Sequence, residues 1–100
     1  MLNSLAHLNM LSYSASMNNR HRKTLEAVFT EPTKSNIAWA DIEALLVAAG
    51  CNIIEGSGSR IRIESGGHVA FFHRPHPQKE SLRYQVKDAR KLLENLEVTP

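Results

Sequence analysis

The sequence predicts an α+β fold in which helices pack on an antiparallel sheet within a single domain. Its length of 100 residues allows one compact domain and no more. Apolar residues recur at helical spacing up to residue 50 and again after residue 81, whereas apolar and polar residues alternate between residues 52 and 73, as in half-buried strands. The predicted order is helix, helix, three strands and helix.

The first predicted helix covers residues 20 to 30. Leu25, Val28 and Phe29 follow helical spacing within it. Pro32 ends this helix, because the residue before a proline avoids helical backbone geometry.

The second predicted helix has a clear apolar face, formed by Trp39, Ile42, Leu45, Leu46 and Ala49. Asp41 and Glu43 lie in its first turns, where the helix dipole favours negative charge. Gly50 is placed to cap its C-terminus. We expect Trp39 to belong to the core.

Three short strands are predicted over residues 52 to 55, 60 to 64 and 68 to 73. The first hairpin turn, Gly56-Ser57-Gly58-Ser59, lacks the lysine of a phosphate-binding loop and joins two strands, so we interpret it as a plain turn. In the second strand Ile61 and Ile63 face the core, while Arg60 and Arg62 face solvent.

A loop at residues 74 to 81 precedes the closing helix, whose apolar stripe consists of Leu82, Val86, Ala89, Leu93 and Leu96. A neighbouring face carries four basic residues at matching spacing, namely Arg83, Lys87, Arg90 and Lys91. Leu93 is expected in the core. For Phe72 the pattern does not distinguish between a place in the core and one on the surface.

The charge is unevenly distributed along the chain. The formal net charge is +2, but eight of the 12 Lys and Arg residues lie in residues 60 to 100. This asymmetry is compatible with a polyanionic partner. The basic residues that we expect to form a phosphate-binding surface, and to contact RNA if the partner is RNA, are Arg60, Arg62, Arg74, Lys79, Arg83, Lys87, Arg90 and Lys91.

The composition also restricts the class of protein. The single cysteine, Cys51, excludes an internal disulfide and a cysteine-based zinc site, and its use fits a reducing cytoplasm. No run of 18 apolar residues is present, so no membrane association is expected. Residues 1 to 16 show no periodicity and are interpreted as a flexible extension, or as sequence upstream of a natural start at Met17.

His73 and His76 carry the candidate acid–base chemistry. Their His-x-x-His spacing suits a metal, but a zinc site needs a third protein ligand and none is evident, so we expect no metal and no cofactor. Imidazole titrates near neutrality and can act as the base or acid in RNA cleavage. A structural role for both histidines, one at a strand end and one between prolines, is the alternative.

Residues 37 to 98 resemble the HicA family of bacterial toxins. The matching segments, in order, are Leu45-Leu46-Val47-Ala48-Ala49-Gly50, Gly58-Ser59-Arg60, His73-Arg74-Pro75-His76-Pro77 and Lys79-Glu80 with the closing helix. The resemblance implies a double-stranded-RNA-binding-like α-β-β-β-α core within a HicA-like domain at residues 17 to 100. The helix at residues 20 to 30 is additional to this core. The resemblance also implies a type II toxin that cleaves messenger RNA without metal and is neutralised by a HicB antitoxin.

One position departs from the family pattern. Arg60 occupies the place of the family's catalytic histidine, and arginine cannot act as a base because its pKa exceeds about 12. We therefore predict His73 or His76 as the base and Arg60 with Arg74 at the phosphate. The antiparallel pairing of the second and third strands is expected to bring Arg60 opposite His73, whereas His68 is expected far along the sheet.

Two alternatives to a ribonuclease remain. The first is a HicA relative that binds RNA or an antitoxin but has lost cleavage. The second is an interaction protein with no role in RNA binding, for which the modest net charge is the argument.

Overall fold

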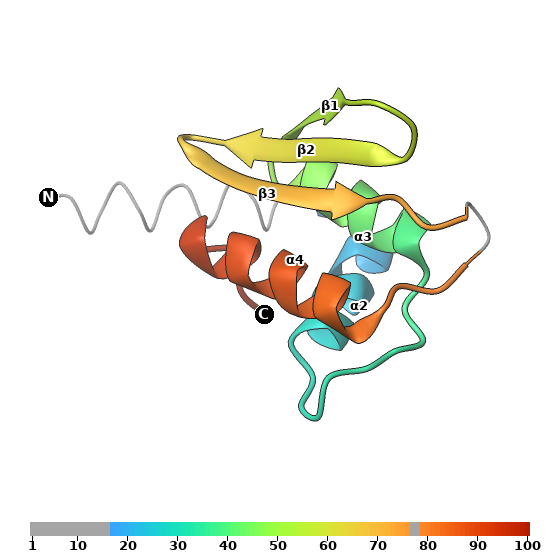
Figure 1. Ribbon diagram of the computed structural model, residues 1–100. Coiled ribbons are helices and arrows are strands. Elements are labelled where there is room, and N and C mark those ends of the chain that lie inside the picture. The colour runs from blue at the N-terminus through green and yellow to red at the C-terminus, as the bar shows by residue number, and fades with distance from the viewer. Residues whose placement is uncertain (1–16, 77–78) are drawn as a thin grey trace, which may run out of the picture.

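A three-stranded antiparallel sheet is covered on one face by helices, as Figure 1 shows. The computed structural model describes residues 17–76 and 79–100. The predicted extension at residues 1 to 16 lies outside the described residues, as do Pro77 and Gln78 of the His-Pro loop. None of the helices in the described ranges has the length and apolar character needed to span a lipid bilayer.

The three predicted helices are confirmed, with ends that differ by one or two residues. They are α2 (Asn19–Val28), α3 (Trp39–Ala48) and α4 (Arg83–Asn95). Asn18 caps α2, because its side-chain oxygen accepts a hydrogen bond of 2.9 Å from the backbone N–H of His21. Figure 1 shows all three helices on the same side of the sheet.

Gly50 ends α3 as predicted. Its φ of 96° is a left-handed conformation that glycine adopts without a steric penalty. The backbone N–H of Gly50 donates to the carbonyl of Val47, and that of Cys51 donates to the carbonyl of Leu46, each at 3.0 Å. This pair of bonds is a Schellman motif, which satisfies the last carbonyls of the helix.

The end of α4 has the same geometry with a different residue. Glu97 has a φ of 61°, and its N–H donates to the carbonyl of Glu94 at 3.0 Å. The N–H of Val98 donates to the carbonyl of Leu93 at 2.9 Å, which completes the motif. A side chain in this conformation is strained, unlike the glycine that ends α3.

The three strands also lie where the alternation predicts them. They are β1 (Asn52–Glu55), β2 (Arg60–Ser65) and β3 (His68–His73), in the spatial order β1-β2-β3. Ile61 and Ile63 are buried, whereas Arg60 and Arg62 are exposed on the opposite face of the sheet. The sheet therefore has one face against the helices and one face open to solvent.

The core lies between the helices and the sheet. The ring of Trp39 on α3 packs against the ring of Phe72 on β3, with centroids 5.1 Å apart. Trp39 and Leu93 are buried, as predicted, and Phe72 belongs to the core with them. The core also takes Leu25 and Val28 from α2, so the first helix is an integral part of the packing.

Candidate nucleic-acid interface

The open face of the sheet carries the candidate site. We use this name for the solvent-exposed face of β2 and β3, on which the side chains of Arg60, Arg62, Phe71 and His73 lie. Strand alternation places them there, because their neighbours Ile61 and Phe72 point into the core. The site is therefore built on regular strands and not on a loop.

Arg60 and His73 lie directly opposite each other on β2 and β3. This confirms the pairing expected from the sequence. The N–H of Arg74 donates to the carbonyl of Ser59 at 2.7 Å, so residues 59 and 74 form a hydrogen-bonded pair. Hydrogen-bonded and non-hydrogen-bonded pairs alternate along an antiparallel ladder, so the next pair, Arg60 and His73, is not hydrogen-bonded. In such a pair the Cα atoms are about 4.5 Å apart and the side chains lie closer together than in a hydrogen-bonded pair.

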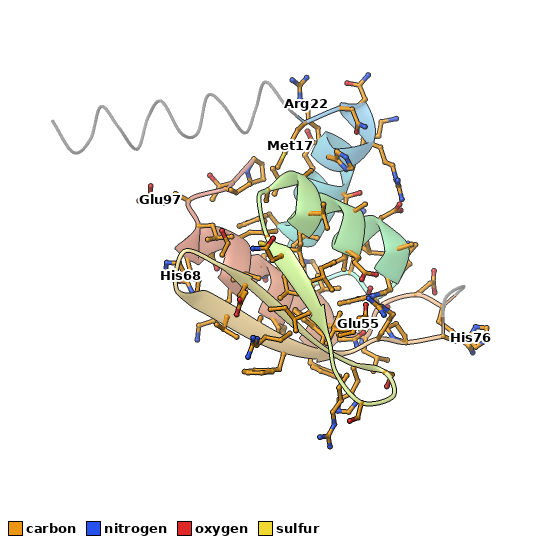
Figure 2. All side chains as sticks on the ribbon, turned by 90° about the horizontal axis from the view of Figure 1, so that it is seen from above. Met17, Arg22, Glu55, His68, His76 and Glu97 are labelled. Atoms are coloured by element: carbon orange, nitrogen blue, oxygen red, sulfur yellow. The ribbon has the colours of Figure 1, made fainter. Side chains whose placement is uncertain are left out.

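The other two candidate histidines are separated from this pair. His68 pairs with Ser65 at the far end of the same two strands. His76 is exposed on the loop that follows β3, and Figure 2 shows His68 and His76 at opposite ends of the molecule. Of the three histidines, His73 alone is paired with an arginine across the sheet.

Arg74 has two carboxylate partners within the protein. Its guanidinium donates to Glu55 of β1 at 2.9 and 3.0 Å and to Glu43 of α3. These hydrogen bonds raise the pKa of Arg74, and the hydrogen bond from Arg74 holds the pKa of Glu55 below its ordinary value. Arg74 thus joins β1, α3 and the end of β3, and its contacts favour positioning over phosphate binding.

Arg90 also has its partners inside the protein. Its guanidinium donates to the backbone carbonyls of Val28 and Thr30, to the hydroxyl of Thr33 and to the carboxylate of Glu31. The Arg90 side chain is only 17% exposed. These contacts connect α4 to the end of α2. Arg90, one of the four residues of the predicted basic stripe of α4, therefore has a structural role.

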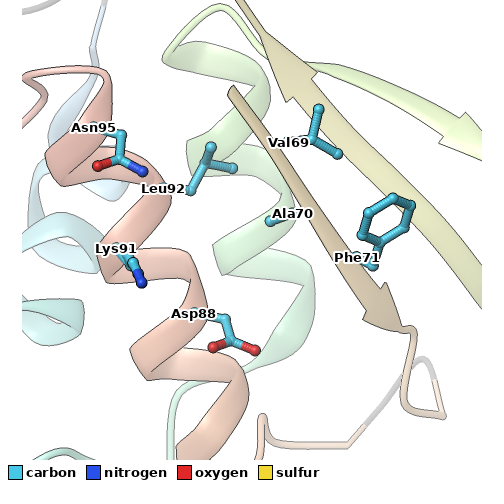
Figure 3. Close-up of a pocket in the computed structure, with 7 residues that line it drawn as sticks. All are labelled: Val69, Ala70, Phe71, Asp88, Lys91, Leu92 and Asn95. Carbon is cyan, nitrogen blue, oxygen red and sulfur yellow. The ribbon is translucent and has the colours of Figure 1, made fainter. Parts of the chain in front are cut away.

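The remaining basic residues of α4 point in two directions. Arg83 and Lys87 line a groove of about 370 Å³ beside the loop at residues 31 to 33. Lys91 lines a second groove, of about 330 Å³, between α4 and the β3 residues Val69 and Phe71, as shown in Figure 3. Only Lys91 therefore lies next to the open face, and Lys79 is exposed on the loop after β3.

The segment after the His-Pro loop is held in place by the start of α3. The N–H of Ser81 donates to the carbonyl of Ile37 at 2.7 Å, and the N–H of Trp39 donates to the carbonyl of Lys79 at 3.3 Å. In addition, Gln85 Nε2 donates to the carbonyl of His73 at 2.8 Å. A side chain of α4, that of Gln85, therefore holds the backbone of the candidate base His73 in place.

Sequence reasoning did not single out Phe71. Its side chain is 72% exposed on the open face. The signal was available, because alternation along β3 forces Phe71 outward once Phe72 is placed in the core. Among the described residues, no group of three or more His, Cys, Asp or Glu side chains is placed to hold a metal ion.

Comparison with known protein families gives a match. A family model described as HicA toxin of bacterial toxin–antitoxin matches residues 39–96, from the start of α3 to the end of α4, which is more than half of the chain. The helix α2 lies outside the match, as the sequence resemblance predicted. No curated protein matches the chain. No solved structure matches it either.

Proposed function

Because the chain belongs to the HicA toxin family of bacterial toxin–antitoxin systems, we propose that it is a toxin that binds and cleaves messenger RNA. The observation that carries this proposal is the direct pairing of Arg60 with His73 on the open face of the sheet. The pair places an imidazole, which can take up a proton, beside a guanidinium, which can stabilise charge on a phosphate. We further propose that the protein acts in the cytoplasm and is neutralised by a HicB-type antitoxin.

The proposed reaction uses no metal. His73 takes the proton of a ribose 2′-hydroxyl, and the 2′-oxygen forms a bond to the adjacent phosphorus. The bond from phosphorus to the 5′-oxygen breaks, and this oxygen takes a proton from water. The products are a 2′,3′-cyclic phosphate and a 5′-hydroxyl, and Arg60 stabilises the charge that develops on the phosphate.

The proposed RNA contacts follow from the exposure of the basic side chains. Arg60 and Arg62 lie on the open face and Lys91 lies beside it. Lys79 is exposed on the loop after β3, and Arg83 and Lys87 line the separate groove beside residues 31 to 33, so these three cations would contact RNA that extends beyond the open face. Arg74 and Arg90 were expected at the phosphates from the sequence. Their carboxylate and carbonyl partners support a structural role for both residues.

The test is cleavage of a messenger RNA by purified protein, free of antitoxin, in the presence of a metal chelator. We expect His73→Ala to abolish cleavage and to leave RNA affinity within about threefold, because the substitution removes none of the lysines and arginines that contact phosphates. His68→Ala is the matched control, since it removes the same side chain from the other end of β3. Products with 2′,3′-cyclic phosphate ends are expected by mass spectrometry. If the wild-type protein cleaves and His73→Ala cleaves equally well, the toxin assignment stands and the assignment of His73 is wrong.

The second candidate function is a HicA relative that binds RNA or an antitoxin without cleaving. Arg60 favours it, because arginine cannot replace a basic histidine. Intact RNA after incubation with the wild-type protein would select this candidate. Arg60→His is then expected to bring cleavage activity, since it places a second imidazole opposite His73. A reading frame for a HicB-type protein beside the gene would support the proposed partner under either function.

A further inference from the structure

Phe71 is the most exposed large apolar side chain among the described residues, at 72%. The neighbouring Phe72 is 2% exposed and packs in the core. Of the two phenylalanines on β3, one is therefore buried and the other faces solvent. Phe71 and its neighbour on the same face, Val69, which is 45% exposed, together form an apolar surface on the open face. Contiguous exposed apolar surface of this kind is available for contact with a ligand.

Two arginines lie next to Phe71 and His73 across the strand pair. Arg62 lies directly opposite Phe71 on β2, as Arg60 lies opposite His73. Both are non-hydrogen-bonded pairs by the alternation described above, so the four side chains form one continuous patch. Phe71 and His73 are two residues apart on the same strand, a distance of about 6.7 Å. The ring thus lies beside the proposed catalytic pair.

A groove runs along the other side of the ring. It separates β3 from α4, has a volume of about 330 Å³, and is lined by Phe71 and by Lys91, among others (Figure 3). Arg62, whose side chain is 46% exposed, also contacts Glu64 through Nε at 3.1 Å. The ring therefore has Arg62 on one side and, on the other, a groove lined by Lys91 and by Asp88.

We propose that Phe71 is a stacking platform for an unpaired nucleobase of the RNA, next to the nucleotide cleaved at His73. An aromatic ring between cations matches single-stranded RNA, whose bases stack on the ring and whose phosphates meet the cations. Arg62 and Lys91 contact the phosphates on either side of the stacked base. The proposal rests on the proposed function and specifies its substrate as single-stranded at this position.

The experiment measures binding of a short fluorescent single-stranded RNA by anisotropy, with His73→Ala as the parent so that the RNA stays intact. We expect Phe71→Ala to weaken binding by about 5- to 150-fold, because stacking contributes this much per base. The slope of affinity against salt stays unchanged, since no cation is lost. Phe71→Leu, which keeps an apolar side chain of similar size, weakens binding in the same way, and Phe71→Trp retains it. Val47→Ala, which truncates an exposed apolar residue on α3, on the other side of the sheet from Phe71, is the control and stays within about twofold of the parent.

A second measurement identifies the base. One abasic nucleotide is moved along the RNA, which removes a single base and keeps every phosphate. At one position the loss of the base is expected to weaken binding to the parent but not to Phe71→Ala. Stacking is refuted if Phe71→Leu binds like the parent, or if the abasic penalty is the same in Phe71→Ala. RNA cleavage by the wild-type protein would stand in either case.

Two further outcomes also overturn the inference and are distinguishable. If the parent itself binds no RNA at any salt concentration, the proposed function fails together with the stacking site. If Phe71→Ala keeps its RNA affinity but loses binding to a HicB-type antitoxin, the exposed ring belongs to a protein interface. Circular dichroism of each variant establishes that the fold is retained.

Discussion

Arg90 of α4 donates a hydrogen bond of 2.8 Å from Nε to the backbone carbonyl of Val28, the last residue of α2. The final carbonyls of a helix have no partner within it, so this guanidinium satisfies a group that the helix leaves open. The two residues are far apart in sequence, and α4 lies within the segment that the family model matches, whereas α2 lies outside it. This hydrogen bond therefore attaches the C-terminal end of α2 to α4.

Arg90→Ala is expected to destabilise the protein by about 1.5–3 kcal/mol, the usual range for hydrogen bonds to a charged group. Lys87→Ala removes an exposed cation one turn earlier on α4 and is expected to change stability by less than about 0.5 kcal/mol. Urea denaturation of both variants measures the difference. Equal midpoints for the two variants would show that the Arg90 contacts do not support the fold.

Glu97→Gly is expected to stabilise the protein by about 1 kcal/mol. The residue has a φ of 61° in the Schellman motif after α4, a conformation that glycine adopts without strain. Glu94→Gly lies within α4 and serves as the control, because glycine inside a helix costs about 1 kcal/mol. Thermal denaturation is therefore expected to move the two variants in opposite directions.

The ion pair between Glu55 and Arg74 makes stability depend on acid pH. The hydrogen bond from Arg74 lowers the pKa of Glu55 from 4.5, so the folded protein binds this proton less readily than the unfolded chain. The stabilisation is complete above this pKa and is lost as the pH falls through the lower, folded value. Urea midpoints at about pH 7 and about pH 3 are expected to differ less in Glu55→Gln than in wild type. Glu94→Gln, on an exposed carboxylate of α4, is expected to retain the wild-type difference.

Cys51 is expected to be inert in the folded protein. Burial raises the pKa of its thiol to about 11, and only 5% of the residue is exposed. An aromatic disulfide reagent at neutral pH should therefore modify it only after denaturant is added. Because the folded pKa lies above the unfolded value of 9.0, the thiol favours the folded state below pH 9.0 and loses this effect as the pH rises to about 11. That alkaline loss is expected to be smaller in Cys51→Ala, and rapid labelling of the native protein would contradict the prediction.

The elements of the fold were predictable because each has its own local signal. The spacing of Trp39 to Ala49, the Gly50 cap and the alternation around Ile61 all depend on residues close in sequence. The pairing of Arg60 with His73 was also predictable, since a short hairpin turn determines the register of its two strands.

The partners of the arginines were not predictable in this way. Arg74 meets Glu43 and Glu55, and Arg90 meets Val28, through contacts that exist only after helices and sheet have packed. On the chain itself, these arginines cannot be distinguished from the exposed Arg60. A basic stripe read from helical spacing shows which side chains share a face, and packing then decides which of them reach solvent.

The core extends beyond the segment that the family shares. Met17, Leu25, Val28, Ile37 and Val98 are buried with the residues of the match, although all five lie outside residues 39–96. Removing them would expose the apolar side chains of α3 and α4 against which they pack. The cooperative folding unit of this chain is therefore larger than its homologous segment, so the boundaries of shared ancestry and of physical stability fall at different residues.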